Sequence, residues 1–188
     1  MKIANVRLSF PDLYVPMEFK KGDGKPRYNA SFLYEAGSDT DKAITAEIQR
    51  LVVEKFGPKA TAKLAAFKAS GDYCIADGNA KDYDGYDGML VLSSHRGAEK
   101  GPVGVYGNVI DPSTGSLVKL TAESGKPYAG CYVNATVSLY TSAKFPGIWC
   151  GLEAVQFWRD GDAFAGGKPP SPDDFEPIAD GADAEAMA

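Results

Sequence analysis

The chain has 188 residues, of which 44% are hydrophobic, 11% aromatic and 24% charged. This length fits one domain with a core of its own, and no apolar run is long enough to span a membrane. The 3 cysteines form no CxxC pair and only 1 histidine is present, which excludes a typical zinc site and suits a reducing compartment. We therefore expect a cytoplasmic protein with no cofactor and no metal.

The formal net charge of −5 comes from one end of the chain. Residues 169–188 contain acids and no Lys or Arg, whereas acidic and basic residues nearly balance in the rest. A proline-broken, like-charged segment cannot bury enough apolar surface to offset its ordering entropy. We predict a folded domain over 1–160 and a flexible Gly/Pro-rich linker and acidic tail over 161–188. Such tails bind partners or shield a basic surface, although a merely solvated terminus is an alternative. The candidate partner-binding residues are Asp173, Asp174, Phe175, Glu176, Asp180, Asp183 and Glu185.

In the first half of the chain the spacing of apolar residues changes from that of a strand to that of a helix. Residues 2–10 alternate between apolar and polar side chains, which predicts a half-buried strand, and 11–27 contain the prolines and glycines of a loop. A second strand is predicted over 28–34. Helical spacing then follows, with Ser38 as the expected N-cap, so a helical insertion is predicted over 38–70.

The second half of the chain returns to strands. They are predicted over 89–94, 103–110, 117–120, 128–140 and 148–158. The segment 128–140 is the clearest, because its apolar side chains all fall on one face. Five to seven strands without a helix at each crossover favour a small antiparallel barrel or sandwich over a parallel sheet. The predicted fold is mainly β: an antiparallel barrel with a helical insertion after the second strand.

Motifs for catalysis are absent from the sequence. There is no glycine-flanked nucleophile elbow, no phosphate-binding loop and no dinucleotide fingerprint, so we expect no enzyme activity. The acidic stretch 77–87 is the exception to consider. Asp77, Asp82, Asp84 and Asp87, with Lys81, could serve a metal-dependent nuclease. Gly88 occupies the place of the glutamate that an EF-hand requires, and a polar loop between strands is the preferred interpretation.

Tyrosines next to basic residues are the remaining signal. Aromatic rings interleaved with cations are what single-stranded nucleic acid needs, because bases stack and phosphates pair with cations. Tyr132 and Tyr140 lie on the polar face of their strand and are better candidates for exposed stacking than Phe10 or Phe32, which lie in apolar rows. Most of the tyrosines are nevertheless expected to be packing groups, since tyrosine is common in strands. The candidate DNA-binding residues are Arg7, Lys20, Lys21, Lys25, Arg27, Arg96, Lys100 and Lys126 for phosphates, and Tyr28, Tyr106, Tyr128 and Tyr132 for bases.

Short motifs spread over nearly the whole chain resemble those of the single-stranded-DNA-binding proteins of tailed phages, which are OB-fold proteins with an acidic tail. The motifs are 6–11 (VRLSFP), 28–33, 107–111 (GNVID), 128–134 (YAGCYVN), 147–156 and Asp173-Asp174-Phe175. The resemblance implies an OB-fold-like barrel with an aromatic and basic groove that binds and protects single-stranded DNA during phage replication and recombination in the host cytoplasm. It also implies a tail that recruits replication or recombination proteins and competes with DNA for the groove. The oligomeric state stays open, with a homodimer as one alternative.

The tail departs from the family pattern at Phe175, which lies thirteen residues before the end instead of closing the chain. This favours electrostatic competition with DNA over docking of the extreme terminus, because a tethered acidic segment acts at high effective concentration. Two other functions are kept as alternatives. One is the metal-dependent nuclease, and the other is a structural or interaction β-protein of a phage particle.

Overall fold

The computed structural model describes residues 1–18 and 24–164. Lys20 and Lys21 lie outside the described residues, as do all the candidate residues of the acidic tail. The predicted domain boundary at residue 160 falls close to the end of the last strand, and residues 161–164 continue along the body of the protein. Phe164, for example, is only 8% exposed.

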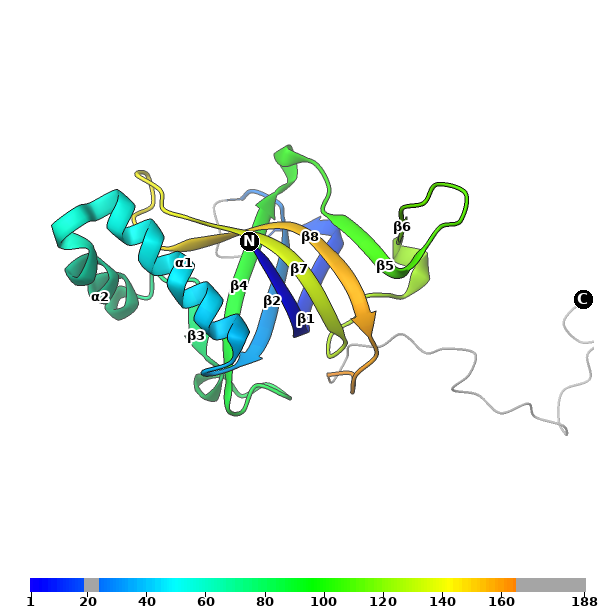
Figure 1. Cartoon of the computed structure of the whole chain (residues 1–188), viewed down its shortest axis with the longest axis horizontal. Helices are drawn as coiled ribbons and strands as arrows, with labels where there is room; N and C mark the ends of the chain where they lie inside the picture. Colours follow the sequence, from blue (N-terminus) through cyan, green and yellow to red (C-terminus); the bar gives the residue numbers. More distant parts are fainter. Residues whose placement is uncertain (19–23, 165–188) are drawn as a thin grey trace, which may run out of the picture.

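Five strands close into a barrel (Figure 1): β1 (Lys2–Met17), β2 (Arg27–Glu35), β4 (Met89–Gly97), β7 (Tyr132–Tyr140) and β8 (Trp149–Arg159). β1 pairs with β2 on one side and with β7 on the other, β2 pairs with β4, and β7 pairs with β8, all antiparallel. A parallel pairing between β4 and β8 closes the ring. This closed barrel, with helices after its second strand, confirms the predicted fold class.

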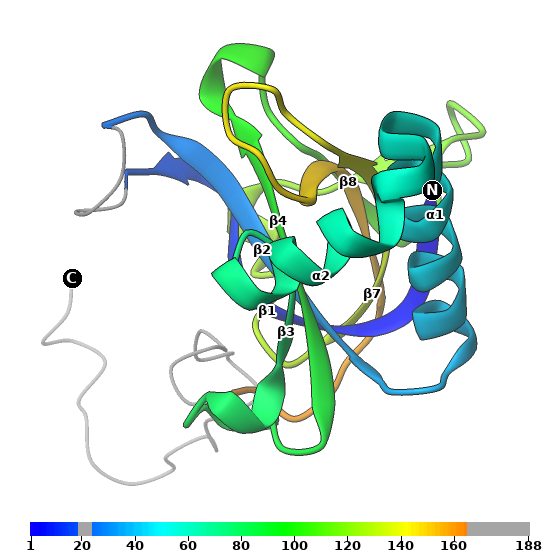
Figure 2. The same cartoon turned by 90° about the vertical axis from the view of Figure 1, so that its left-hand side faces the viewer.

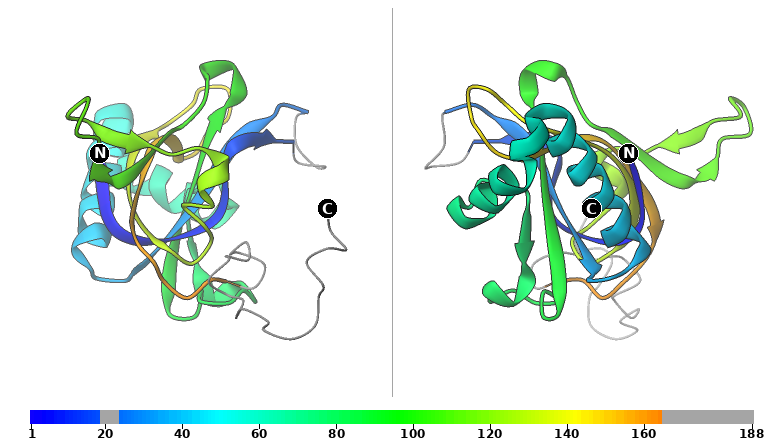
Figure 3. Two further views of the ribbon diagram at one scale, coloured as in Figure 1. Left: turned by 90° about the vertical axis from the view of Figure 1, so that its right-hand side faces the viewer. Right: turned by 60° about the vertical axis from the view of Figure 1, so that its left-hand side comes forward.

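Three further strands extend the sheet beyond the barrel. β3 (Ile75–Asp77) pairs with β4. β5 (Gly104–Ile110) runs parallel to β8 and forms a hairpin with β6 (Leu117–Lys119). Figure 3 shows this hairpin projecting away from the barrel. Four short 3-10 helices connect the elements: Gly57–Lys59, Gly78–Ala80, Ala98–Lys100 and Ala122–Ser124.

The helical insertion consists of α1 (Asp39–Phe56) and α2 (Ala60–Ser70), which lie on one side of the barrel (Figure 2). The Ser38 side chain accepts a hydrogen bond from the Asp41 amide, as its predicted N-cap role requires. Ile44, Ile48 and Val52 form the buried face of α1, which packs against β2 and β7. No helix within 1–18 and 24–164 is long and apolar enough to cross a membrane.

The barrel core is filled by the inward rows of the strands. The apolar row predicted along β7 is buried as expected, with Val133 fully buried and Val137 1% exposed. Phe32, Leu92 and Leu152 from the facing strands are fully buried as well. Burial of each such side chain contributes about 1.5–3 kcal/mol to the stability of the fold, so the barrel is the rigid part that supports the outer surface.

β1 differs from the prediction because it continues through residues 11–17, which were predicted as loop. Its pairing is interrupted by register shifts, and Asn5 and Phe10 have positive φ angles of 53° and 47°. A bulge inserts a residue and reverses which face the following side chains occupy. Phe10, predicted in the apolar row, is therefore 51% exposed on the outer surface. The strict alternation expected from the sequence is wrong at this point.

Candidate nucleic-acid interface

A groove with a volume of about 470 Å³ lies where β2 begins and β4 ends. It gathers four of the predicted phosphate-binding residues: Lys25 and Arg27 before and at the start of β2, and Arg96 and Lys100 at the end of β4 and in the turn that follows it. In Figure 2 this turn lies near the connection between β7 and β8 at the top of the view. We call this cavity the basic groove. Its lining residues are Lys25, Arg27, His95, Arg96, Gly97, Glu99, Lys100, Ser138, Tyr140, Phe145, Gly151, Leu152 and Glu153.

Arg96 holds the wall of the basic groove in place. Its guanidinium forms a 2.8 Å ion pair with Glu153 and donates to the carbonyl oxygens of Lys100 (2.8 Å) and Gly101 (3.0 Å). These three acceptors engage each nitrogen of the guanidinium, so the residue fixes the turn that carries Lys100. Two of its five N–H donors are not used by these contacts, so the predicted phosphate contact of Arg96 stays a prediction beside its role in holding this turn.

Two aromatic side chains line the basic groove. The Tyr140 hydroxyl lies 3.1 Å from Nε2 of His95, and partial burial raises the pKa of Tyr140. Phe145, in the connection between β7 and β8, is 57% exposed. The Trp149 indole donates a 2.9 Å hydrogen bond to the Phe145 carbonyl and steadies this connection. Sequence reasoning missed Phe145, because no period or motif marks a lone aromatic in a loop.

Two predicted stacking residues are buried instead. Tyr28 is 8% exposed and lies on the inward face of β2, in the same row as Ala30 and Phe32. Tyr128 is 4% exposed, and its hydroxyl donates to Asp160 and contacts the Gly161 carbonyl at 2.9 and 3.0 Å. Neither ring offers a face to a base, so the stacking predictions at these two positions are corrected.

A cation–aromatic row on the outer face of the barrel holds Arg7 and Tyr132. Arg7, Tyr132 and Arg159 pair side by side on β1, β7 and β8. The Arg159 guanidinium lies 3.5 Å from the centroid of the Tyr132 ring, and that of Arg7 lies 5.7 Å from it. Arg7 also donates to the carbonyls of Gly130 and Asp162. The row lines a separate cavity of about 360 Å³, and Arg159 was missed because the sequence does not show which residue it faces.

The two remaining candidates lie apart from the basic groove as well. Tyr106 lines a hollow of about 400 Å³ over β5, β7 and β8. Lys126 forms a 3.0 Å ion pair with Asp160, and its ammonium lies 4.4 Å from the centroid of the Phe157 ring. The structure thus brings together Lys25, Arg27, Arg96 and Lys100, and it distributes the other described candidates over different surfaces.

The acidic stretch 77–87 forms a loop and not a metal centre. Asp77 accepts hydrogen bonds from the backbone and side chain of Asn79, whose own oxygen accepts from the Gly88 amide. Within residues 1–18 and 24–164, no three potential metal ligands lie close enough together to hold an ion. These contacts agree with the preferred interpretation as a polar loop, and among the described residues the alternative nuclease has no assembled cluster of metal ligands.

The basic groove overlaps in part with the binding surface typical of its fold. Five-stranded barrels of this kind bind oligonucleotides on the face of their second and third strands and on the loops between strands one and two and between strands four and five. Here the second and third barrel strands are β2 and β4, and the β7–β8 connection supplies Phe145. The groove therefore combines a suitable location with cations and an exposed ring.

Comparisons with known proteins show the family of the chain. The family model described as "Enterobacter phage Enc34, ssDNA-binding protein" matches residues 1–187. "Putative protein p50" of Acyrthosiphon pisum secondary endosymbiont phage 1 is 38% identical over 192 residues, which cover 100% of this chain and 98% of that protein.

Two solved structures share the fold. The single-stranded DNA-binding protein from bacteriophage Enc34 in complex with ssDNA superposes with a TM-score of 0.61 at 21% identity, over 86% of this chain and 87% of that one. Gp2.5, a single-stranded DNA binding protein encoded by bacteriophage T7, gives a TM-score of 0.53 at 14% identity over 86% and 92% of the two chains. At these identities the likeness shows the fold alone.

Proposed function

Because the chain belongs to the family of the phage Enc34 single-stranded-DNA-binding protein, we propose that it binds single-stranded DNA through the basic groove without reading sequence. The family membership confirms the resemblance predicted from the sequence. The family is one of DNA-binding proteins and not of enzymes, in agreement with the expectation that the chain has no catalytic activity.

The observation that carries this proposal is the meeting of cations and an exposed ring in one groove, where the start of β2 and the end of β4 meet β7 and β8. Lys25, Arg27 and Lys100 supply positive charge for phosphates, which is the main source of affinity for nucleic acid. Phe145 and Tyr140 supply ring faces for bases, and such stacking contributes about 1–3 kcal/mol per base whatever the base is. A groove of this kind therefore favours sequence-tolerant binding.

The proposal extends to the biological role of the protein. Sequence-tolerant binding protects single strands that are exposed during replication and recombination of phage DNA, and the setting for that role is the cytoplasm of the host cell. The acidic residues of 169–188 have the charge to occupy a cationic groove until DNA displaces them, and to recruit replication or recombination proteins when released.

The test is a titration of the full chain with labelled oligo-dT at two salt concentrations, using the double variant Arg27→Ala/Lys100→Ala. Each phosphate contact on a single strand contributes about 0.7 to the slope of log affinity against log salt. We expect the variant to lose up to about 1.4 from this slope. Its affinity at low salt should fall by about tenfold, since two charge contacts are removed.

The matched control is Lys59→Ala/Lys63→Ala, which removes the same charge from exposed positions of the helical insertion. An equal loss in both variants would show that only net charge matters and would contradict binding in the groove. Absence of binding to oligo-dT at low salt, or an affinity that ignores salt, would refute the proposed function. Magnesium-dependent cleavage of the oligonucleotide that Asp84→Ala abolishes would favour the nuclease.

A further inference from the structure

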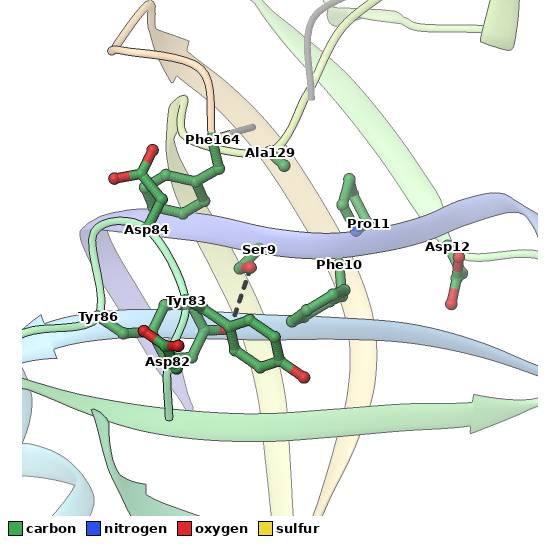
Figure 4. A pocket seen from close by; sticks show the side chains of 10 residues that line it. All are labelled: Ser9, Phe10, Pro11, Asp12, Asp82, Tyr83, Asp84, Tyr86, Ala129 and Phe164. Atoms are coloured by element: carbon green, nitrogen blue, oxygen red, sulfur yellow. Dashed lines mark hydrogen bonds between the residues drawn. The ribbon is translucent and has the colours of Figure 1, made fainter. Parts of the chain in front are cut away.

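A further cavity, with a volume of about 580 Å³, lies between β1 and the loop of residues 78–88 (Figure 4). Its walls include two aromatic rings, Phe10 and Tyr83, and three carboxylates, Asp12, Asp82 and Asp84. We call it the acidic cleft. None of the residues that line it lines the basic groove. The loop of the acidic cleft precedes β4, whereas the turn of the basic groove follows β4, so these two segments lie at opposite ends of the strand.

The acidic cleft is built on a fixed support. Tyr86 is 2% exposed, and its hydroxyl donates a 3.0 Å hydrogen bond to Oγ of Ser9 on β1. Tyr86 also packs with Leu33, Val91 and Phe164 in a small apolar cluster outside the barrel. Figure 4 shows the Ser9–Tyr86 contact at the base of the cleft, with Phe10 and Tyr83 next to each other. The loop is therefore anchored, and the cleft does not have to be ordered by its ligand.

The rings of the acidic cleft are exposed where burial would be expected. Phe10 is 51% and Tyr83 53% exposed, and the two rings meet edge to face with centroids 5.3 Å apart. Phe10 holds a φ of 47°, a conformation that costs a residue with a side chain on the order of 1 kcal/mol or more. The backbone at this bulge thus turns a large apolar ring toward solvent, where it forms an exposed aromatic pair with Tyr83.

The charge around these rings is negative and lacks a described counterion. No Lys or Arg within 1–18 and 24–164 forms an ion pair with Asp12, Asp82 or Asp84. Burial raises the pKa of the Asp12 carboxyl, and the hydrogen bond that Asn29 donates to it at 3.3 Å offsets this effect only in part. The Arg7 guanidinium lies 4.5 Å from the centroid of Phe164, a ring that lines the cleft, and its hydrogen bonds go to the carbonyls of Gly130 and Asp162 and not to the three carboxylates. A DNA phosphate entering this cleft would meet like charges at short range, each repelling it by about 1 kcal/mol or more.

We propose that the acidic cleft docks a basic peptide segment of a partner protein. An arginine or lysine head group placed over Phe10 or Tyr83 gains a cation–π interaction, and Asp82 and Asp84 at the rim pair with the same positive charge. The aromatic rings that line the cleft pack against the methylene groups of such a side chain. Because the basic groove shares no lining residue with the cleft, the protein can hold the partner and DNA together.

The test uses the full chain and a short fluorescent peptide in which arginine alternates with glycine, measured by anisotropy at about 0.1 M salt so that long-range attraction is screened. The double variant Asp82→Asn/Asp84→Asn should bind it about fivefold more weakly, since each exposed pair contributes up to about 1 kcal/mol. Tyr83→Ala should lose a similar factor through the cation–π interaction. A peptide with citrulline in place of arginine keeps the shape without the charge and should not bind measurably.

The matched control is Asp173→Asn/Asp174→Asn, which changes the net charge equally at positions outside the described residues. It should alter peptide affinity by less than about twofold. An equal loss in this control would show unspecific attraction and overturn the proposal. A fall in oligo-dT affinity in the Asp82/Asp84 variant would show that the cleft takes nucleic acid. Sedimentation that detects a dimer lost in the same variant would assign the cleft to a second copy of the chain. Circular dichroism checks that each variant is folded.

Discussion

The basic groove and the acidic cleft are two hollows on the outer surface of one barrel, and they are built alike. Each has exposed aromatic surface, Phe145 in the groove and Phe10 with Tyr83 in the cleft. In each hollow the hydrogen bonds of one side chain hold the surrounding backbone in place. Arg96 bonds to the turn of the groove, and Tyr86 anchors the loop of the cleft to β1. They differ in the charges around the rings: the groove has four cations against Glu99 and Glu153, and the cleft is lined by carboxylates without a Lys or Arg.

This difference shows that exposed rings alone do not identify a nucleic-acid site. An aromatic face accepts a base and a cation equally well, because it offers both stacking and a negative quadrupole. The surrounding charges select between them. Lys25, Arg27 and Lys100 around Phe145 favour a polyanion, whereas Asp82 and Asp84 around Tyr83 favour a cation. Three experiments beyond those above test this contrast, in order of decreasing effect.

Removal of residues 169–188 should act on the basic groove and leave the acidic cleft unchanged. A tethered acidic segment competes with DNA at high effective concentration, so its loss should tighten oligo-dT binding about tenfold at low salt, with a smaller gain at high salt. Affinity for the arginine peptide should stay within about twofold, because the cleft repels the tail. The measurement is a pair of anisotropy titrations on the same preparation.

The control for this truncation is a tail of full length in which the acids are replaced by their amides. It should reproduce the tightening, since charge and not length is the cause. Weaker DNA binding after truncation would contradict competition, and tighter peptide binding would show that the tail also reaches the cleft.

Exchange of one exposed ring in each hollow should separate the two sites. Phe145→Ala should weaken oligo-dT binding by about fivefold, which corresponds to the lower end of the energy of stacking one base. Phe10→Ala should leave oligo-dT affinity within about twofold and instead weaken binding of the arginine peptide. Both rings are more than half exposed, so thermal unfolding should show similar stability for the two variants. A loss of DNA affinity in both would mean that one continuous surface binds DNA.

The sequence predicted the barrel well because its signals were local. The alternation in β7 and the cap at Ser38 each report on residues close along the chain, and both are found as predicted. The site was harder, since it depends on which strands become neighbours. The sequence suggested that Tyr28 and Tyr128 are exposed rings next to cations, but both side chains are buried. Phe10 looked like a core residue, but a bulge that no sequence period reveals turns it outward.

The cations show the same limit. Lys25, Arg27, Arg96 and Lys100 come from segments far apart in sequence and meet because β2 pairs with β4, with Arg27 opposite Gly97. The sequence alone does not predict which residues of β2 and β4 lie opposite each other. Nor could composition show that the guanidinium of Arg96 donates hydrogen bonds to Glu153 and to two carbonyls of the turn that follows β4. The sequence therefore predicted candidate residues, and the structure adds which of them lie in one groove and which contacts each of them makes.

Asp12→Asn should give the smallest effect, on stability, and it tests whether the acidic cleft carries uncompensated charge. Burial raises the pKa of Asp12 above its ordinary value of 3.8, although the amide of Asn29 donates to the carboxylate at 3.3 Å. The folded protein thus favours the protonated carboxyl. That contribution to stability is fully present below pH 3.8 and is lost as the pH rises through the raised pKa in the folded state. At neutral pH the charged form costs stability.

An asparagine at position 12 keeps an oxygen for Asn29 and removes this cost. The free energy of unfolding should therefore rise by a few tenths of a kcal/mol at about pH 7, a small amount because the group is only partly buried. The gain should fade as the pH drops through the raised pKa, where the wild-type carboxyl is protonated as well. Urea unfolding across this pH range measures it, with Asp82→Asn as the exposed comparison in the same cleft. A destabilised Asp12→Asn at neutral pH would mean that the charge is already compensated, and it would weaken the case for a cationic partner.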